Sequence, residues 1–255
     1  MKTTISLIIT LLLLAAPAWA GIVEKTVLYE HDGTELEGFL AYDDSIAGPR
    51  PGVVVVHQWK GLTEYEKMRS RMLAELGYVA FAADIYGKGV RAKDNKEAKK
   101  LATVFYKDRN LMRARVNAAY EELKKQKVTD TSKTAAMGYC FGGTVALDLA
   151  RSGADVLGTV TFHGGLSTPT PEDAKNIKGK VLALHGAADQ SVLPEHVAAF
   201  QKEMSDAGVD WYMEIYAYAP HAFTHKGPRY NEPADLRSWE EMKDFFRELF
   251  TPLSL

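Results

Sequence analysis

The chain has 255 residues, of which 46% are hydrophobic and 25% charged, and it contains 20 glycines and 10 prolines. This composition is typical of a globular protein and excludes collagen-like, low-complexity and disordered chains. A formal net charge of −2 leaves no basic excess for a nucleic-acid partner, and the single cysteine, Cys140, excludes an internal disulfide and a cysteine-rich metal site.

The first twenty residues have the pattern of an export signal. Lys2 precedes an almost unbroken apolar run over residues 5–16, and Pro17 is followed by Ala18-Trp19-Ala20, the small-x-small pattern of a signal-peptidase site. The run is too short to span a bilayer comfortably, although an uncleaved N-terminal anchor is the alternative. We expect residues 1–20 to be removed and residues 21–255 to form a single domain with no stable membrane anchor. The expected location is the periplasm or the medium.

Strand and helix patterns alternate along the rest of the chain. An Asp-Gly turn at 32–33 separates two strand patterns and predicts a hairpin, and Thr63-Glu64-Tyr65-Glu66 is a capping box that opens a helix ending near Gly77. Strands are expected at 23–29, 34–42, 53–56, 79–83, 133–139, 156–162, 180–184 and 211–216, and further helices at 95–107, 110–127, from 144, at 194–207 and at 234–250. This alternation predicts an α/β protein with a mostly parallel sheet and helices on both faces. Its ligand site is then expected at the carboxyl edge of the strands.

A nucleophile-elbow pattern lies between one predicted strand and the next helix. Gly138-Tyr139-Cys140-Phe141-Gly142-Gly143 has sulfur where the usual motif has a serine oxygen. The sharp turn strains the nucleophile's backbone, and glycines at 138 and 142 remove side chains that would collide. Cys140 is then displayed at a helix N-terminus, where the dipole favours a thiolate. The alternative is a buried structural cysteine.

Two further residues complete a possible triad. Asp189 follows the strand at 180–184 and His221 follows the strand at 211–216, so the chain order is nucleophile, acid, histidine, as in α/β-hydrolases. We expect His221 to take the Cys140 proton, while Asp189 fixes the tautomer and stabilises the imidazolium. The alternatives are a helix N-cap for Asp189 and a surface-loop position for His221.

Together these segments resemble the dienelactone hydrolase family of α/β-hydrolases over nearly the whole chain after residue 20. The resemblance rests on VVVVHQWKG at 53–61, LGYVAFAADIYG at 76–87, the elbow, and the loops of Asp189 and His221. It implies an α/β-hydrolase fold and a Cys140–His221–Asp189 triad that opens small carboxylic esters or lactones through an acyl-thioester. It also implies an oxyanion hole from the backbone N–H groups of Trp59 and Phe141. We expect no cofactor, because the sequence has no spaced cluster of metal ligands.

Three positions depart from that family's pattern. Gln58 replaces a glutamate that interacts with the resting thiol, and Lys88 and His225 stand where arginines grip the substrate carboxylate. We expect Gln58 to tune the thiol, and Lys88, His225 and Tyr86 to contact the substrate. Lys88 supplies charge without a bidentate fork. These changes argue against dienelactone itself and leave ester or lactone opening intact.

Other functions account for parts of the sequence. His57, His163 and His185 each follow a predicted strand and could converge on a metal, but they lack a tight ligand motif, so we expect none. A periplasmic thiol redox or sensing protein would use an exposed thiolate without needing the hydrolase order of acid and histidine. A catalytically silent binding module would keep the fold and lose turnover.

Overall fold

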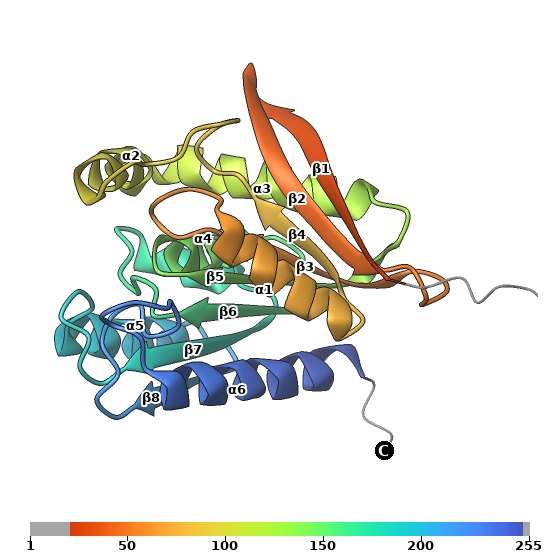
Figure 1. The fold of residues 1–255 in the computed structure, drawn as a ribbon. Helices are drawn as coiled ribbons and strands as arrows, with labels where there is room; N and C mark the ends of the chain where they lie inside the picture. The colour runs from red at the N-terminus through yellow and green to blue at the C-terminus, as the bar shows by residue number, and fades with distance from the viewer. Residues whose placement is uncertain (1–20, 252–255) are drawn as a thin grey trace, which may run out of the picture.

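The computed structural model describes residues 21–251, so the predicted signal segment, residues 1–20, lies outside the described part of the chain. One eight-stranded sheet forms its centre, with strand order β1-β2-β4-β3-β5-β6-β7-β8 (Figure 1). The strands are β1 (Ile22–His31), β2 (Thr34–Asp43), β3 (Arg50–Val56), β4 (Val79–Ala83), β5 (Thr129–Tyr139), β6 (Gly158–Phe162), β7 (Lys180–Gly186) and β8 (Trp211–Tyr216). The pairs β1–β2 and β2–β4 are antiparallel, and every other neighbouring pair is parallel. This is the mostly parallel α/β sheet that the sequence predicts.

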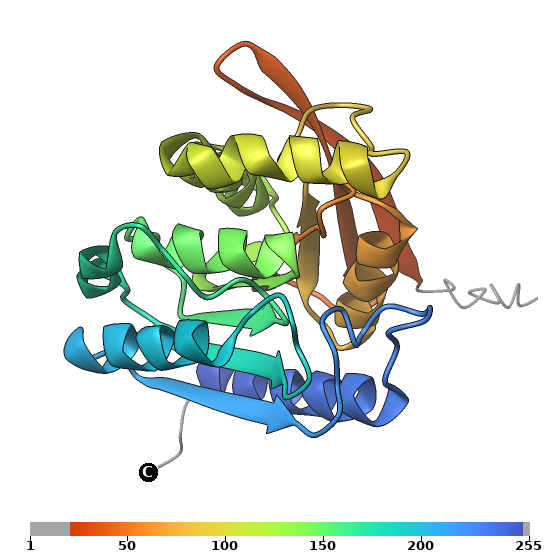
Figure 2. The ribbon, with the colours of Figure 1, turned by 90° about the vertical axis from the view of Figure 1, so that its left-hand side faces the viewer.

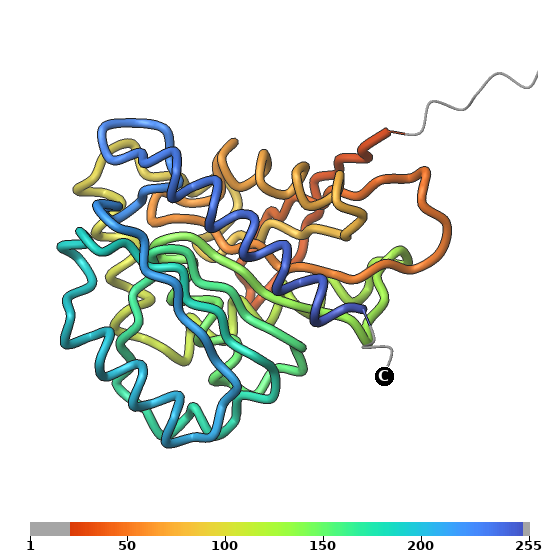
Figure 3. The backbone as a smooth tube through the Cα atoms, turned by 90° about the horizontal axis from the view of Figure 1, so that it is seen from below, coloured from red at the N-terminus to blue at the C-terminus, as the bar shows by residue number. Residues whose placement is uncertain are grey.

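Helices cover both faces of the sheet. They are α1 (Glu64–Glu75), α2 (Asn95–Lys107), α3 (Arg109–Lys125), α4 (Phe141–Arg151), α5 (Pro194–Asp206) and α6 (Glu232–Phe250), with a 3₁₀ turn η1 at Pro171–Asn176. Figure 2 shows α1 and α6 on one side of the sheet and the other four helices on the opposite side. Seen from below, α6 runs across the sheet, where it contacts β5, β6 and β7 (Figure 3). No helix within residues 21–251 is long and apolar enough to cross a membrane.

The alternation of side chains along the central strands divides the core into two layers. On β3, Val53 and Val55 pack with α1 and α6, whereas Val54 and Val56 pack with α3 and α4. All four valines are fully buried. A run of β-branched residues buried on both faces is the expected signature of a central parallel strand.

Most predicted elements lie where expected, and the differences have local causes. The strands at 79–83 and 211–216 match, and positive φ at both Asp32 and Gly33 forms the predicted hairpin turn. β5 begins at Thr129 rather than at residue 133, because a bulge opposite Pro51 and Gly52 interrupts its pairing and hides the strand pattern. The helix expected from residue 144 begins at Phe141, so the elbow glycines belong to its first turn.

Candidate active site

The backbone at Cys140 is held in a strained conformation between β5 and α4. Its φ of 55° and ψ of −117° are unusual for any residue other than glycine. A Cβ added to Gly138 would lie 2.1 Å from the Gly142 carbonyl oxygen, and one added to Gly142 would lie 2.2 Å from the Val56 oxygen. Glycine is therefore required at both positions, as the elbow pattern predicts.

The structure brings the three candidate catalytic side chains together at the carboxyl edge of the sheet. Nε2 of His221 lies 3.0 Å from Sγ of Cys140, and Nδ1 of His221 lies 2.9 Å from Oδ2 of Asp189. The other Asp189 oxygen accepts the N–H groups of Ser191 (2.7 Å) and Val192 (3.0 Å). These two bonds hold the carboxylate with its free oxygen toward His221. The helix N-cap considered for Asp189 is instead at Leu193.

Cys140, His221 and Asp189 form a continuous row of contacts, and the charges of His221 and Asp189 stabilise each other. Burial alone would lower the pKa of His221, but its contacts with Asp189 and Cys140 outweigh burial and raise that pKa to about 10. Burial would raise the pKa of Asp189, but the hydrogen bond from His221 and those from the Ser191 and Val192 amides leave it below the usual value. The imidazole is therefore cationic at neutral pH, held between the carboxylate and the sulfur.

Buried polar contacts fix the loop that follows β3. His57 Nε2 accepts the Ile85 N–H (3.2 Å), so its proton is on Nδ1, which donates to the Gln58 carbonyl at 2.6 Å. Because the peptide group is planar, fixing the Gln58 carbonyl also fixes the Trp59 N–H, which points the opposite way. Buried Glu66 holds the same loop by accepting the Gln58 N–H at 3.1 Å. The sequence identified Glu66 only as part of a capping box and His57 only as a metal candidate.

Two N–H groups thus have the positions expected of an oxyanion hole. Phe141 is the first residue of α4, so its N–H has no acceptor within the helix. Among the hydrogen bonds of residues 21–251, the Trp59 N–H has no acceptor either. Neither N–H is therefore used by another group in the described part of the chain.

The three histidines considered as metal ligands are used differently. Both ring nitrogens of His57 and of His163 contact protein atoms, and His185 is a buried residue whose pKa is lowered by burial. Within residues 21–251, no group of three or more His, Cys, Asp or Glu side chains is arranged to hold a metal ion.

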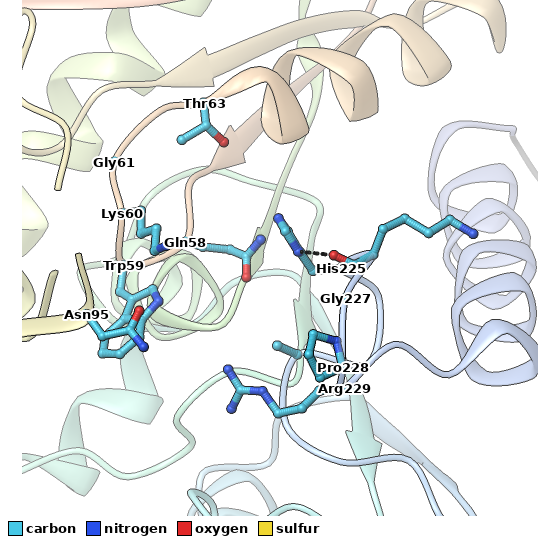
Figure 4. Close-up of a pocket in the computed structure, with 12 residues that line it drawn as sticks. Gln58, Trp59, Lys60, Gly61, Thr63, Asn95, His225, Gly227, Pro228 and Arg229 are labelled. Atoms are coloured by element: carbon cyan, nitrogen blue, oxygen red, sulfur yellow. Dashed lines mark hydrogen bonds between the residues drawn. The ribbon is translucent and has the colours of Figure 1, made fainter. Parts of the chain in front are cut away.

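A cavity of about 450 Å³ is lined in part by Ala222, the residue after His221, and by none of Cys140, His221 and Asp189 (Figure 4). Its lining residues come from the loop after β3, the start of α2 and the loop after His221: Gln58, Trp59, Lys60, Gly61, Thr63, Asn95, Ala222, His225, Lys226, Gly227, Pro228 and Arg229. The lining contains basic side chains and no acidic one. In Figure 4 the Arg229 guanidinium points into the opening. The Lys226 ammonium lies over the Tyr230 ring, with Nζ 3.7 Å from the ring centre.

The substrate contacts expected from the sequence are only partly in this cavity. His225 lines it, but Lys88 does not: its ammonium pairs with Glu35 at 2.6 Å, and its N–H donates to the Glu35 carbonyl. The chain turns toward β2 at Gly87, where φ is 131°, and this turn carries Lys88 away. Tyr86 is buried, and its hydroxyl donates to the Trp59 carbonyl at 3.0 Å, so it supports the loop after β3. Arg229 was not identified from the sequence, because no motif surrounds it.

Comparison with known proteins agrees with this geometry. Residues 36–250 match the model of the dienelactone hydrolase family. The chain belongs to the dienelactone hydrolase family. The solved structure m3DLH is 38% identical, covers 91% of this chain and 100% of its own, and superposes with a TM-score of 0.87. The dienelactone hydrolase-like promiscuous phosphotriesterase P91, from metagenomic libraries, is 38% identical over 90% of this chain and 99% of its own, with a TM-score of 0.85.

A relative from Aquifex aeolicus, named "Putative carboxymethylenebutenolidase", is 30% identical over 88% of this chain and 97% of its own length. The eight-stranded sheet is accordingly the α/β-hydrolase fold of this hydrolase family.

The raised pKa of His221 predicts how its contribution to stability changes with pH. Because that pKa is about 10 in the folded protein and about 6.5 when unfolded, the folded state favours the protonated ring. The stabilisation is therefore complete below pH 6.5 and is lost as the pH rises toward 10. Urea unfolding of wild type and His221→Gln should show a difference in unfolding free energy that shrinks across this range. A difference that stays constant from pH 6 to 10 would contradict the assignment.

Proposed function

We propose that the protein is a hydrolase of small carboxylic esters or lactones that uses Cys140 as its nucleophile. The observation that carries the proposal is the continuous row from Cys140 Sγ through His221 to Asp189, with contacts of 3.0 and 2.9 Å, on a strained elbow. A structural cysteine would need neither the strained backbone nor the aligned imidazole. The carboxymethylenebutenolidase and phosphotriesterase names of its relatives support a hydrolytic role at this site.

The geometry suggests a two-step acyl transfer. His221 holds the proton taken from Cys140, and the thiolate attacks the substrate carbonyl, whose oxygen becomes an oxyanion held by the N–H groups of Trp59 and Phe141. Collapse breaks the bond to the ester oxygen, which receives the proton from His221 and leaves an acyl-thioester on Cys140. His221, neutral once it has given up that proton, deprotonates a water molecule that attacks the thioester. Collapse releases the acid and restores the Cys140 thiolate beside the protonated His221. In a lactone, the alcohol formed in the first step stays attached to the acyl group.

The cavity favours substrates with a negative charge. Arg229 forms no ion pair among the described residues, and its guanidinium points into the opening, so it can receive a carboxylate or phosphate as a fork. Lys88, already paired with Glu35, is not available for that role.

We further place the mature enzyme in the periplasm or outside the cell, on the basis of residues 1–20. Its proposed partner is a small-molecule substrate, with neither nucleic acid nor a membrane anchor involved.

Removing the nucleophile tests the proposal most directly. Cys140→Ala should lower kcat/KM for a chromogenic ester by about 10³-fold or more, the usual cost of losing a covalent nucleophile. Wild-type activity should survive EDTA, because no step uses a metal. Hydrolysis at the wild-type rate by Cys140→Ala would refute the mechanism, and loss with EDTA that zinc restores would favour the histidine metal site. A thiol sensor or silent binding module would show no turnover in either protein.

A second pair of variants tests the charge in the cavity. Arg229→Ala should raise KM about tenfold for a carboxylate-bearing lactone, equivalent to about 1.4 kcal/mol, and should spare a neutral ester. Lys88→Ala is the matched control, because it removes a positive charge outside the cavity. Equal effects of Arg229→Ala on both substrates would show that its charge does not contact the substrate.

Position 58 offers a test of how the thiol is tuned. A carboxylate beside the sulfur would disfavour the thiolate by like-charge repulsion, and Gln58 has the same polarity without that charge. We therefore expect the midpoint of the pH profile for Cys140 alkylation by iodoacetamide to move upward in Gln58→Glu. The midpoint belongs to the coupled Cys140–His221 pair. Coincident profiles would mean that the side chain at position 58 does not face the sulfur.

A further inference from the structure

His163 occupies a position that a histidine adopts only at some cost. It follows β6 directly, is fully buried, and has a φ of 41°, in the left-handed region. The next two residues, Gly164 and Gly165, are glycines, so the left-handed conformation falls on the histidine and not on the residues best suited to it. Such a conformation persists where contacts of the side chain offset its cost.

Both ring nitrogens make specific contacts. The Cys140 N–H donates to His163 Nδ1 at 3.1 Å and also to the Phe162 carbonyl at 3.0 Å. Nδ1 therefore carries no proton, and the neutral ring has its proton on Nε2, which lies 2.8 Å from Oγ1 of Thr224 and donates to it. Burial, with the His221 charge close by, holds the pKa of His163 well below its usual range and keeps the ring neutral.

The second partner, Thr224, lies on the loop that carries His221. The two histidine rings meet edge to face, with centroids 5.4 Å apart. The neutral His163 ring thus contacts the backbone of Cys140 on one side and the loop of His221 on the other. The second contact joins His163 and Thr224, which are 61 positions apart in sequence.

The Thr224 end of this bridge is itself fixed. Its Oγ1 also accepts the Tyr65 hydroxyl at 2.7 Å, and the Tyr65 oxygen accepts the Arg69 Nε–H at 3.2 Å. Arg69 is buried and forms an ion pair with Asp235 at the start of α6. Thr224 is therefore held by a chain of buried polar groups that spans α1 and α6 on one face of the sheet.

We propose that His163 is a positioning residue that ties the Cys140 backbone to the His221 loop and so maintains the 3.0 Å separation between Sγ and Nε2. It touches no reacting atom. This inference rests on the proposed function, in that it assigns a support to the same Cys140–His221 pair. Its consequence is that breaking either end of the bridge impairs proton transfer without changing substrate binding.

Thr224→Val tests the bridge with little change in shape. We expect kcat for a neutral chromogenic ester to fall about tenfold with KM within about twofold, and alkylation of Cys140 at pH 7 to slow similarly, because small misplacements of reacting groups are costly. Thr224→Ser keeps the hydroxyl and should restore both rates. The matched control is Thr134→Val, which removes a buried hydroxyl bonded to the Asp155 carbonyl and Tyr120, further back along β5.

His163→Asn breaks the same contact from the histidine side, since asparagine tolerates the left-handed backbone and offers an acceptor to the Cys140 N–H but is too short to reach Thr224. It should resemble Thr224→Val, and the double variant should be no slower than either single one, because both break the same bridge. Effects that multiply in the double variant, or a Thr224→Val enzyme no slower than Thr134→Val, would overturn the inference.

The alkylation measurement needs no turnover. A wild-type protein that hydrolyses no ester would refute the proposed function, and the alkylation rates of the Thr224 and His163 variants would still decide the bridge.

Discussion

The close approach of backbone to backbone at the elbow is the constraint on which the rest of the site depends. Gly142 sits so near the end of β3 that an added Cβ would lie 2.2 Å from the Val56 oxygen and 2.6 Å from the His57 oxygen. The loop leaving β3 is therefore pressed against the first turn of α4. The Trp59 and Phe141 N–H groups, which we propose as the oxyanion hole, belong to these two adjoining segments although they lie more than eighty positions apart in sequence. The strain at Cys140 is the local cost of that proximity.

Three histidines around this turn carry out different tasks because their surroundings differ. Burial lowers the pKa values of His57 and His163, and each neutral ring acts as donor and acceptor at once. Their tautomers are opposite: His57 has its proton on Nδ1 and fixes the loop after β3, whereas His163 has it on Nε2 and contacts the loop of His221. His221, between a carboxylate and a sulfur, is the ring that holds a charge. A neutral ring beside His221 also adds no repulsion to that charge.

The parts of the site that sequence reasoning could predict are those in which local pattern and chain order suffice. The glycines of the elbow are needed for contacts within a few residues of Cys140, and acid and base follow strands whose order the motif fixes. Lys88 shows the limit: its place in the sequence matches that of a substrate-binding residue, but the turn at Gly87 directs it to β2. The His163–Thr224 contact joins residues 61 positions apart, and no periodicity or motif signals such a pair. The start of β5 at Thr129 also escapes prediction, because the strand changes register at a bulge that depends on its pairing with β3.

The loop between His221 and α6 separates two kinds of residue. Its first part, residues 222–224, is buried and ends in Thr224, the partner of His163, whereas residues 225–229 are exposed and supply five of the twelve residues that line the cavity. Exposed positions tolerate substitution with little effect on folding, whereas buried hydrogen-bonded ones do not. A lineage carrying this fold can therefore acquire new substrate preferences by drift at residues 225–229 while its reaction chemistry is inherited unchanged. Diversity among descendants is then expected first in the exposed segment, and last in the three residues that precede it.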